Sequence, residues 1–178
     1  MLVIPPTDLV RLCASRWFIP VLAAMDEAGG ARFGVLVRKL ETSRSVLSRC
    51  LDDLERQGWI GRNPGHGHPL RHEYLLTEAG RPLAAWSHRV MKERRKLGLG
   101  NPDLGRWSLP LLLRLDHGWK RFSALEAELD PISPRSLSLA LKQSMESRLV
   151  TRRLEDRFPP LPLYGLTKRG QGFAKALL

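Results

Sequence analysis

An internal repeat constrains the fold of this 178-residue chain more than any other feature. The string Arg16-Trp17-x-x-Pro20 recurs 90 residues later as Arg106-Trp107-x-x-Pro110. The pair Phe33 and Phe122 is 89 residues apart, and the spacing of 90 then returns in Leu47/Leu137, Ser48/Ser138, Arg62/Arg152, Tyr74/Tyr164, Thr77/Thr167 and Gly80/Gly170. Because so long a common register indicates duplication, we expect copy one in residues 1–97 and copy two in residues 98–178, with the boundary in a Gly- and Pro-containing stretch.

Each copy begins with the same order of helix signals. We expect helices over residues 19–28 and 109–116 with proline in the first turn, the second one capped by Ser108. A short strand ending in Arg-Phe should follow, and then helices over residues 34–40 and 123–129. After a tight turn, Ser43 and Ser133 are expected to cap helices that end near residues 57 and 147, the first stopped by Gly58.

Two strands and a closing helix are expected to complete each copy. Residues 59–63 and 73–77 form one strand pair, and residues 149–153 and 163–167 form the other. Thr77 and Thr167 can each cap a closing helix, which is long in copy one and reaches about Lys96. This order is typical of the winged helix-turn-helix. The sequence therefore predicts a mainly α fold with small β-wings (α+β), built as tandem winged helix-turn-helix domains.

Charge and composition limit the kinds of partner and the cellular location that we expect for the protein. The chain has 29 Lys and Arg against 18 Asp and Glu, a net charge of +11, which favours a polyanionic partner such as nucleic acid. Its two cysteines have no metal-type spacing, so we expect a reducing, cytoplasmic location. The apolar segment 17–25 contains Pro20 and recurs in copy two, which argues against a signal peptide. No stretch approaches the roughly 20 apolar residues that cross a bilayer, so no membrane association is expected.

The helix after Ser43 has the two faces that a DNA recognition helix needs. Leucines at helical spacing form its inner side, which leaves Arg44, Ser45, Ser48 and Arg49 for bases and phosphates. The alternative is an ordinary helix with a solvated basic face.

Copy two has a weaker version of this pattern, because Leu139 stands where copy one has Arg49. Its candidate DNA contacts are Arg135, Ser136 and Lys142, and in its wing Arg153 and Arg157. The wing of copy one offers His66, His68, Arg71 and His72 for phosphate or minor-groove contacts. The partly apolar wing tip of copy two also allows a protein partner or self-association there.

Other chemistry has little support in the sequence. His66-Gly-His68 lacks a nearby Cys or carboxylate pair, so we predict no metal site. No cofactor is expected, and the sequence does not determine whether a small-molecule effector binds. No phosphate loop, nucleophile elbow or zinc-helix motif is present, so an enzyme is not expected. The repeated aromatic residues are interpreted as hydrophobic core: Trp17, Trp107, Phe33, Phe122, Tyr74 and Tyr164.

The repeated motifs resemble the HxlR-type branch of the MarR-like regulators. The resemblance is carried by Ile-Ser-Pro-Arg-Ser-Leu-Ser-x-x-Leu-Lys at 132–142, Leu-Val-x-Arg at 149–152 and Leu-Thr-x-x-Gly at 166–170, and by Gly-Trp-Ile-x-Arg at 58–62 and Leu-Thr-x-x-Gly at 76–80 in copy one. It implies a sequence-specific double-stranded DNA-binding transcriptional regulator. Such proteins usually carry one copy per chain and form homodimers, so two fused copies suggest an intramolecular pseudo-dimer.

The resemblance also bears on Cys13, which matches the family's N-terminal segment and is a candidate redox sensor. The alternative for this cysteine is a small buried apolar residue. Two alternative functions keep the same fold: a winged-helix protein-interaction module, and a non-specific nucleic-acid-binding protein.

Overall fold

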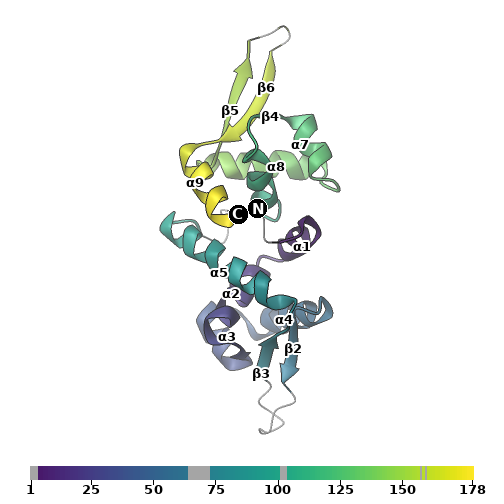
Figure 1. Cartoon of the computed structure of the whole chain (residues 1–178), viewed down its shortest axis with the longest axis vertical. Helices are drawn as coiled ribbons and strands as arrows, with labels where there is room; N and C mark the ends of the chain where they lie inside the picture. The colour runs from purple at the N-terminus through teal and green to yellow at the C-terminus, as the bar shows by residue number, and fades with distance from the viewer. Residues whose placement is uncertain (1–3, 64–72, 101–103, 157, 159) are drawn as a thin grey trace. The chain divides into compact units, whose positions relative to one another are not determined.

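A computed structural model describes residues 4–63, 73–100, 104–156, 158 and 160–178 of the chain. The contacts divide it into two compact units that meet between Lys92 and Glu93. The first unit holds the elements of copy one up to Lys92, and the second holds the last turn of the closing helix of copy one and the elements of copy two (Figure 1). The boundary expected at residue 97 remains a prediction.

Copy one begins with two helices, α1 (Pro6–Leu12) and α2 (Phe18–Ala28), which the short strand β1 (Ala31–Arg32) follows. The helix-turn-helix comes next, as α3 (Phe33–Leu40) and α4 (Arg44–Arg56). Strands β2 (Ile60–Asn63) and β3 (Glu73–Leu76) precede the closing helix α5 (Gly80–Lys96). The three strands form an antiparallel sheet in the order β1-β3-β2.

Copy two repeats this order from its first long helix onward. It comprises α6 (Ser108–Leu115), β4 (Lys120–Arg121), α7 (Phe122–Glu128), α8 (Pro134–Glu146), β5 (Val150–Glu155), β6 (Leu161–Leu166) and α9 (Lys168–Leu177). Its antiparallel sheet has the matching order β4-β6-β5. Tyr74 lies opposite Arg62 in one sheet and Tyr164 lies opposite Arg152 in the other. The predicted tandem winged helix-turn-helix fold is confirmed.

The predicted helix caps at the turn are confirmed in both copies. The hydroxyl of Ser43 accepts a hydrogen bond from the Val46 amide at 3.3 Å, and that of Ser133 accepts one from the Ser136 amide at 3.2 Å. After α4 the chain turns at Gly58, whose φ is +73°. The equivalent turn in copy two is made by Arg148 at φ +56°, a backbone conformation that residues other than Gly, Asn and Asp adopt less readily.

One expectation about the helices is wrong, and one helix was not predicted. Ser108 does not cap α6: it is the first residue of the helix, is fully buried and makes no capping hydrogen bond, and Trp107 takes the cap position. Helix α1 was not predicted, because its seven residues are too short to show a helical period.

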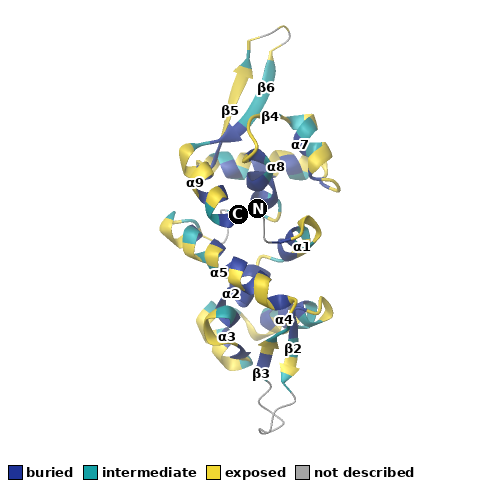
Figure 2. Cartoon of the chain, in the orientation of Figure 1, coloured by how far each residue is buried: buried dark blue, intermediate teal, exposed yellow. Residues whose placement is uncertain are grey.

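The interior of each unit is formed by apolar side chains, mostly on the inner faces of its helices, and buried residues are shown dark blue in Figure 2. Three of the matched positions at which the two cores differ change their size and polarity most. Phe18, Leu54 and Trp59 are buried in copy one, where the rings of Phe18 and Trp59 meet edge to face at 6.2 Å. Copy two has Ser108, Ser144 and Leu149 there. Neither serine hydroxyl has a hydrogen-bond partner among the described residues, so copy two has a smaller and more polar core at this point.

The expectation that all six repeated aromatic residues lie in the core is also wrong. Of the six, Tyr74 is buried and the other five are half-buried. Trp17 and Trp107 each carry the guanidinium of the preceding arginine over the ring, at 5.3 and 5.4 Å. Cation–π contacts of this kind let an aromatic side chain remain partly in solvent, a pattern that hydrophobicity alone does not reveal.

The helices of the part of the chain that the structure describes include none long and apolar enough to span a bilayer.

The closing helix of each copy begins in contact with the backbone that follows the second helix of the helix-turn-helix, α4 in copy one and α8 in copy two. The Thr77 hydroxyl donates to the Gly58 carbonyl at 2.6 Å, and the Gly80 amide donates to the Thr77 hydroxyl at 3.1 Å. Thr167 makes the same bonds, to the Arg148 carbonyl at 2.7 Å and from the Gly170 amide at 3.0 Å. A Cβ atom on Gly80 would lie 1.8 Å from the Trp59 carbonyl oxygen, and one on Gly170 would lie 2.0 Å from that of Leu149. Only glycine fits at these two positions.

This close approach predicts opposite effects for two glycines of α9. Gly170→Ala should lower the free energy of unfolding by about 1 to 3 kcal/mol, because the backbone must move away from the Leu149 carbonyl. Gly172→Ala should raise it by about 0.5 to 1 kcal/mol, because its Cβ would meet no atom within 4 Å and alanine favours the helix. Urea unfolding of both variants tests this. Equal destabilisation by the two substitutions would contradict it.

Candidate nucleic-acid interface

Helix α4 presents a polar face to solvent and an apolar face to the core. Leu47, Cys50, Leu51 and Leu54 are buried at helical spacing. The predicted contact residues Arg44, Ser45, Ser48 and Arg49 are all exposed, on the first two turns after the Ser43 cap. The structure thus brings these four predicted residues together at the N-terminal half of one helix, the part that reaches base edges in helix-turn-helix proteins.

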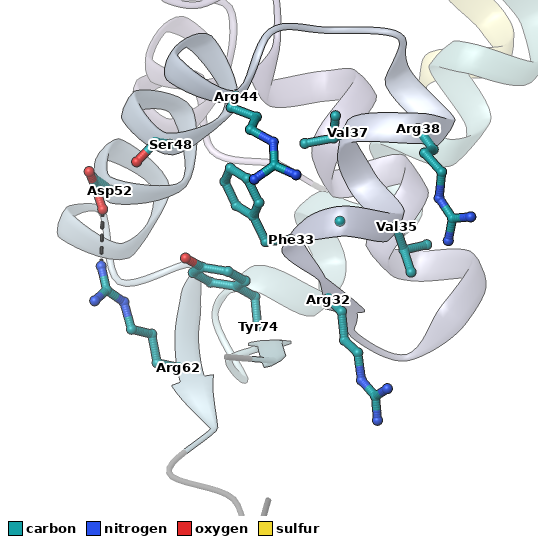
Figure 3. Close-up of a pocket in the computed structure, with 11 residues that line it drawn as sticks. Arg32, Phe33, Val35, Val37, Arg38, Arg44, Ser48, Asp52, Arg62 and Tyr74 are labelled. Carbon is teal, nitrogen blue, oxygen red and sulfur yellow. Dashed lines mark hydrogen bonds and ion pairs between the residues drawn. The ribbon is translucent and has the colours of Figure 1, made fainter. Parts of the chain in front are cut away.

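An open groove of about 830 Å³ lies beside this helix, between α3, α4 and the sheet (Figure 3). Phe33, Val35 and Val37 from α3 and Tyr74 from β3 supply its apolar lining. Its charged lining residues are Arg32, Arg38, Arg44, Asp52 and Arg62. Figure 3 shows the Arg44 side chain extending from α4 toward the Phe33 ring, so the groove and the exposed face of α4 form one basic surface.

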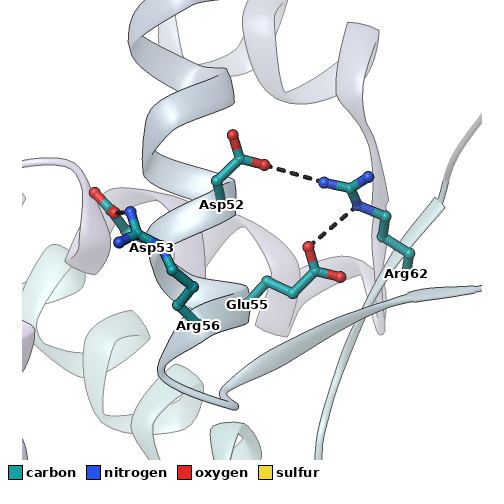
Figure 4. Close-up of polar contacts among 5 residues, drawn as sticks. All are labelled: Asp52, Asp53, Glu55, Arg56 and Arg62. Carbon is teal, nitrogen blue, oxygen red and sulfur yellow. Dashed lines mark hydrogen bonds and ion pairs between the residues drawn. The ribbon is translucent and has the colours of Figure 1, made fainter.

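Ion pairs sort the arginines of this surface into two groups. Arg62 contacts Asp52 at 3.0 Å and Glu55 at 3.2 Å, and Arg56 pairs with Asp53 (Figure 4). The carboxylates of the C-terminal half of α4 are therefore matched within the protein. By contrast, four arginines make no ion pair among the described residues: Arg32, Arg38, Arg44 and Arg49. The unmatched positive charge gathers at the start of α4 and along α3.

Tyr74 lies where the sheet meets α4, and its surroundings favour the neutral phenol. Burial raises the pKa of the Tyr74 hydroxyl, Arg62 opposes this shift, and Asp52 and Glu55 add to it. The hydroxyl is thus a hydrogen-bond donor, not an anion, at neutral pH.

The matching helix of copy two carries less free charge. Arg135 is exposed, but Ser136 is half-buried and its hydroxyl accepts a hydrogen bond from that of Ser133 at 2.9 Å. Lys142 is exposed and lies 3.9 Å from Glu146. Leu139 is 54% exposed at the place of Arg49. The three predicted contacts of α8 share one helix, but this helix has a mixed polar and apolar face.

The predicted wing residues are placed only in part. His66, His68, Arg71, His72 and Arg157 lie outside the described residues. Arg153 is exposed on β5, and its guanidinium lies 4.1 Å from the centre of the Trp119 ring. No group of three or more His, Cys, Asp or Glu residues suited to a metal occurs in the described part of the chain, and the His-Gly-His segment is not in that part.

Comparison with known proteins decides the family. The model of the HxlR-like helix-turn-helix family matches the chain twice, over residues 12–96 and 104–178. The chain belongs to the HxlR-like helix-turn-helix family.

Several relatives of this HxlR-like protein are transcriptional regulators by name. It is 44% identical over 78 residues to uncharacterized HTH-type transcriptional regulators of Mycobacterium tuberculosis and Mycobacterium bovis. The match covers 43% of this chain and 48% of theirs, so the chain spans about half the length of the curated relatives it matches.

Two solved structures are also similar to parts of the chain. A MarR-family transcriptional regulator of Enterococcus faecalis is 30% identical, with a TM-score of 0.42, and the match covers 49% of this chain and 74% of that one. Diamide-treated YodB from B. subtilis is 25% identical, with a TM-score of 0.37, and the match covers 40% and 70%.

Sequence reasoning missed two features of this HxlR-like surface. One is the pairing of Arg62 with Asp52 and Glu55, which means that Arg62 is not among the arginines without an ion pair. The signal available in the sequence was the helical spacing of these acidic residues on the outer side of α4. The other is Trp119 beneath Arg153. Aligning the copies shows that Trp119 replaces Gly30 while Gly165 replaces Leu75, a compensating exchange that the sequence contains.

Both cysteines of the HxlR-like chain are buried thiols outside any disulfide. Burial, with a smaller contribution from Asp53, raises the pKa of the Cys50 thiol to about 12. At neutral pH Cys50 is therefore almost entirely protonated and a poor nucleophile. The role of Cys13 as a redox sensor remains a prediction.

Slow thiol labelling is the expected outcome in the native protein. With a pKa of about 12, Cys50 should react with Ellman's reagent at pH 8 at least about 100-fold more slowly than an exposed cysteine, and at the exposed rate in urea. Labelling of the Cys13→Ser variant isolates Cys50. Rapid native labelling of that variant would show that the thiol is accessible and ionised.

Proposed function

We propose that this chain is a transcriptional regulator that binds double-stranded DNA. The observation that carries the proposal is the unmatched positive charge of Arg44 and Arg49 at the start of a capped, exposed helix, beside a basic groove. Duplex DNA neutralises such arginines and releases its own counterions, which gives a large and salt-dependent affinity. Membership of the HxlR-like family and the names of the mycobacterial relatives support the same role.

Copy one is proposed to supply the sequence preference. Arginine contacts guanine through two hydrogen bonds in the major groove, and the exposed Ser45 and Ser48 can bond to bases or phosphates. The carboxylate of Asp52 would otherwise repel the DNA backbone. Its pairing with Arg62 reduces that repulsion without using Arg44 or Arg49.

Copy two is proposed to act mainly through phosphates and to serve as the second half of a pseudo-dimer. Its free basic residues, Arg135 and Arg153, suit contacts that do not discriminate between sequences. Because Leu139 replaces Arg49, the two halves of the DNA site should differ. The wing residues His66, His68, Arg71 and His72 are proposed to contact phosphates or the minor groove beside copy one.

A second candidate function is a protein interaction through copy two. Leu139 is 54%, Leu154 60% and Phe158 98% exposed, which is unusual for large apolar side chains that have no partner. This role is compatible with DNA binding by copy one.

Replacement of the two unmatched arginines tests the main proposal. Arg44→Ala and Arg49→Ala should each weaken specific DNA binding by about 1 to 3 kcal/mol, because each removes a contact to a base. Arg56→Ala is the matched control, since this arginine is on the same helix, is exposed and already pairs with Asp53. Its effect should stay below about 0.5 kcal/mol. Fluorescence anisotropy with duplexes selected from genomic DNA gives the affinities.

The outcomes separate the alternative functions. Unchanged affinity in both the Arg44 and Arg49 variants would remove α4 from the mechanism. Equal binding to selected and randomised duplexes would indicate a non-specific nucleic-acid-binding protein.

The pseudo-dimer predicts an asymmetric DNA site bound by one chain. Sites selected from random duplexes should be imperfect palindromes with half-sites about one helical turn apart, and the stronger base preference should lie in one half. Arg49→Ala should weaken the preference in that half alone. Light scattering should give the mass of a single chain, both free and per DNA duplex. Perfectly palindromic sites, or an obligate dimer of chains, would contradict the pseudo-dimer.

A further inference from the structure

The outer face of the copy-two sheet holds a tryptophan that copy one lacks. Trp119 directly precedes β4 and is 40% exposed. Its ring lies against Gly165 of β6: a Cβ atom on this glycine would be 2.7 Å from Cδ2 of the indole. Because real Cβ atoms do not approach so closely, only glycine at position 165 admits the ring.

The same ring carries an arginine with no carboxylate partner. The guanidinium carbon of Arg153 lies 4.1 Å from the Trp119 ring centre, which is within cation–π range and shorter than the two other such contacts described above. Arg153 is exposed and makes no ion pair among the described residues. Its cross-strand neighbour on β6 is the apolar Leu163.

Copy one has the opposite arrangement at the same positions. Gly30 stands in place of Trp119 and Leu75 in place of Gly165, and a Cβ atom on Gly30 would lie 2.7 Å from the Leu75 side chain. The large and small residues have thus exchanged places. Asn63 replaces Arg153 and hydrogen-bonds to Glu73 at 3.4 Å, so this face of copy one has an acidic side chain where copy two has Leu163.

We propose that Trp119 is a positioning residue that holds the Arg153 guanidinium ready to bind a phosphate of duplex DNA, at a site that only copy two possesses. This proposal rests on the proposed function. Stacking on the indole restricts the rotamers of the arginine, so less conformational entropy is lost on binding. The guanidinium donors lie in its own plane, so a ring beneath it leaves them free for phosphate oxygens.

The positive charge of this surface favours a phosphate over other ligands. The chain carries a net charge of +11, and on this face Arg153 is exposed and makes no ion pair among the described residues. A phosphodiester backbone offers repeated anionic oxygens along the wing without requiring any shape complementarity. The interaction is therefore sequence-independent, which matches the role proposed for copy two.

The test is a double-mutant cycle on the full chain with a fluorescein-labelled mixed-sequence duplex of about 30 bp. Arg153→Ala should weaken binding about three- to tenfold and reduce the slope of log K against log salt by about 0.9. The exchange variant Trp119→Gly/Gly165→Leu gives copy two the residues of copy one. It should weaken binding about two- to fivefold, and Arg153→Ala should have a smaller effect in its background than in the wild type.

A second, more conservative variant serves as the control for effects on folding. Trp119→Phe keeps a smaller ring over Gly165 and should fall between the wild type and the exchange variant in affinity, with an unchanged unfolding midpoint. Arg153→Lys keeps the charge without the planar group, so it should retain the salt slope and lose part of the affinity.

Two results would overturn the proposal. One is an Arg153→Ala variant with wild-type affinity and salt slope on a duplex to which Arg44→Ala binds more weakly; the proposed function would then stand without this site. The other is full additivity of Arg153→Ala with the exchange variant, which would mean that Trp119 acts independently of the arginine. Failure of the wild-type chain to bind any duplex would instead remove the proposed function itself.

Discussion

The junction between the recognition helix and the closing helix governs the geometry of each copy. The carbonyl groups of Gly58 and Trp59, just beyond α4, are bonded by the Thr77 hydroxyl and amide, and Gly80 packs directly on the second of these carbonyls. Arg148, Leu149, Thr167 and Gly170 repeat the arrangement. Because the two wing strands run between these bonded groups, the junction sets where the hairpin leaves the helix. The direction of the wing relative to the recognition helix follows from a threonine and a glycine.

Around this fixed junction the two copies have diverged in chemistry. Copy one has a larger aromatic core, a helix face with unmatched arginines, and Glu73 at the sheet position where copy two has Leu163. Copy two has buried serines in its core, exposed Leu139 on its helix and a tryptophan-supported arginine on its sheet. The junction tolerates this divergence because its hydrogen bonds use backbone groups and the threonine hydroxyl, and none of the diverged side chains.

Much of the fold could be predicted from the sequence because its determinants are local. Ser43, Ser133 and Gly58 act through their own hydrogen bonds and backbone angles, so the caps and the turn were predicted correctly. Ser108 was misassigned because a serine two residues before a proline suggests a cap, whereas the fold buries it in the first turn of α6. The candidate contacts on α4 were placed on the exposed face by helical spacing alone. Which arginines are free depends on pairs such as Asp52 with Arg62, which come from different elements, and that information exists only once the helix and the sheet have packed together.

The difference between the exposed faces of α4 and α8 within one chain has a genetic consequence under the proposed function. In a homodimer every codon change in the recognition helix appears twice, so both halves of the DNA site must change together for binding to survive. In the proposed pseudo-dimer a change at Arg49 leaves position 139 untouched, so each half of a DNA site would change separately with its own helix. Such a chain would acquire new DNA sites by single steps, each altering one half of the site while the other half maintains occupancy.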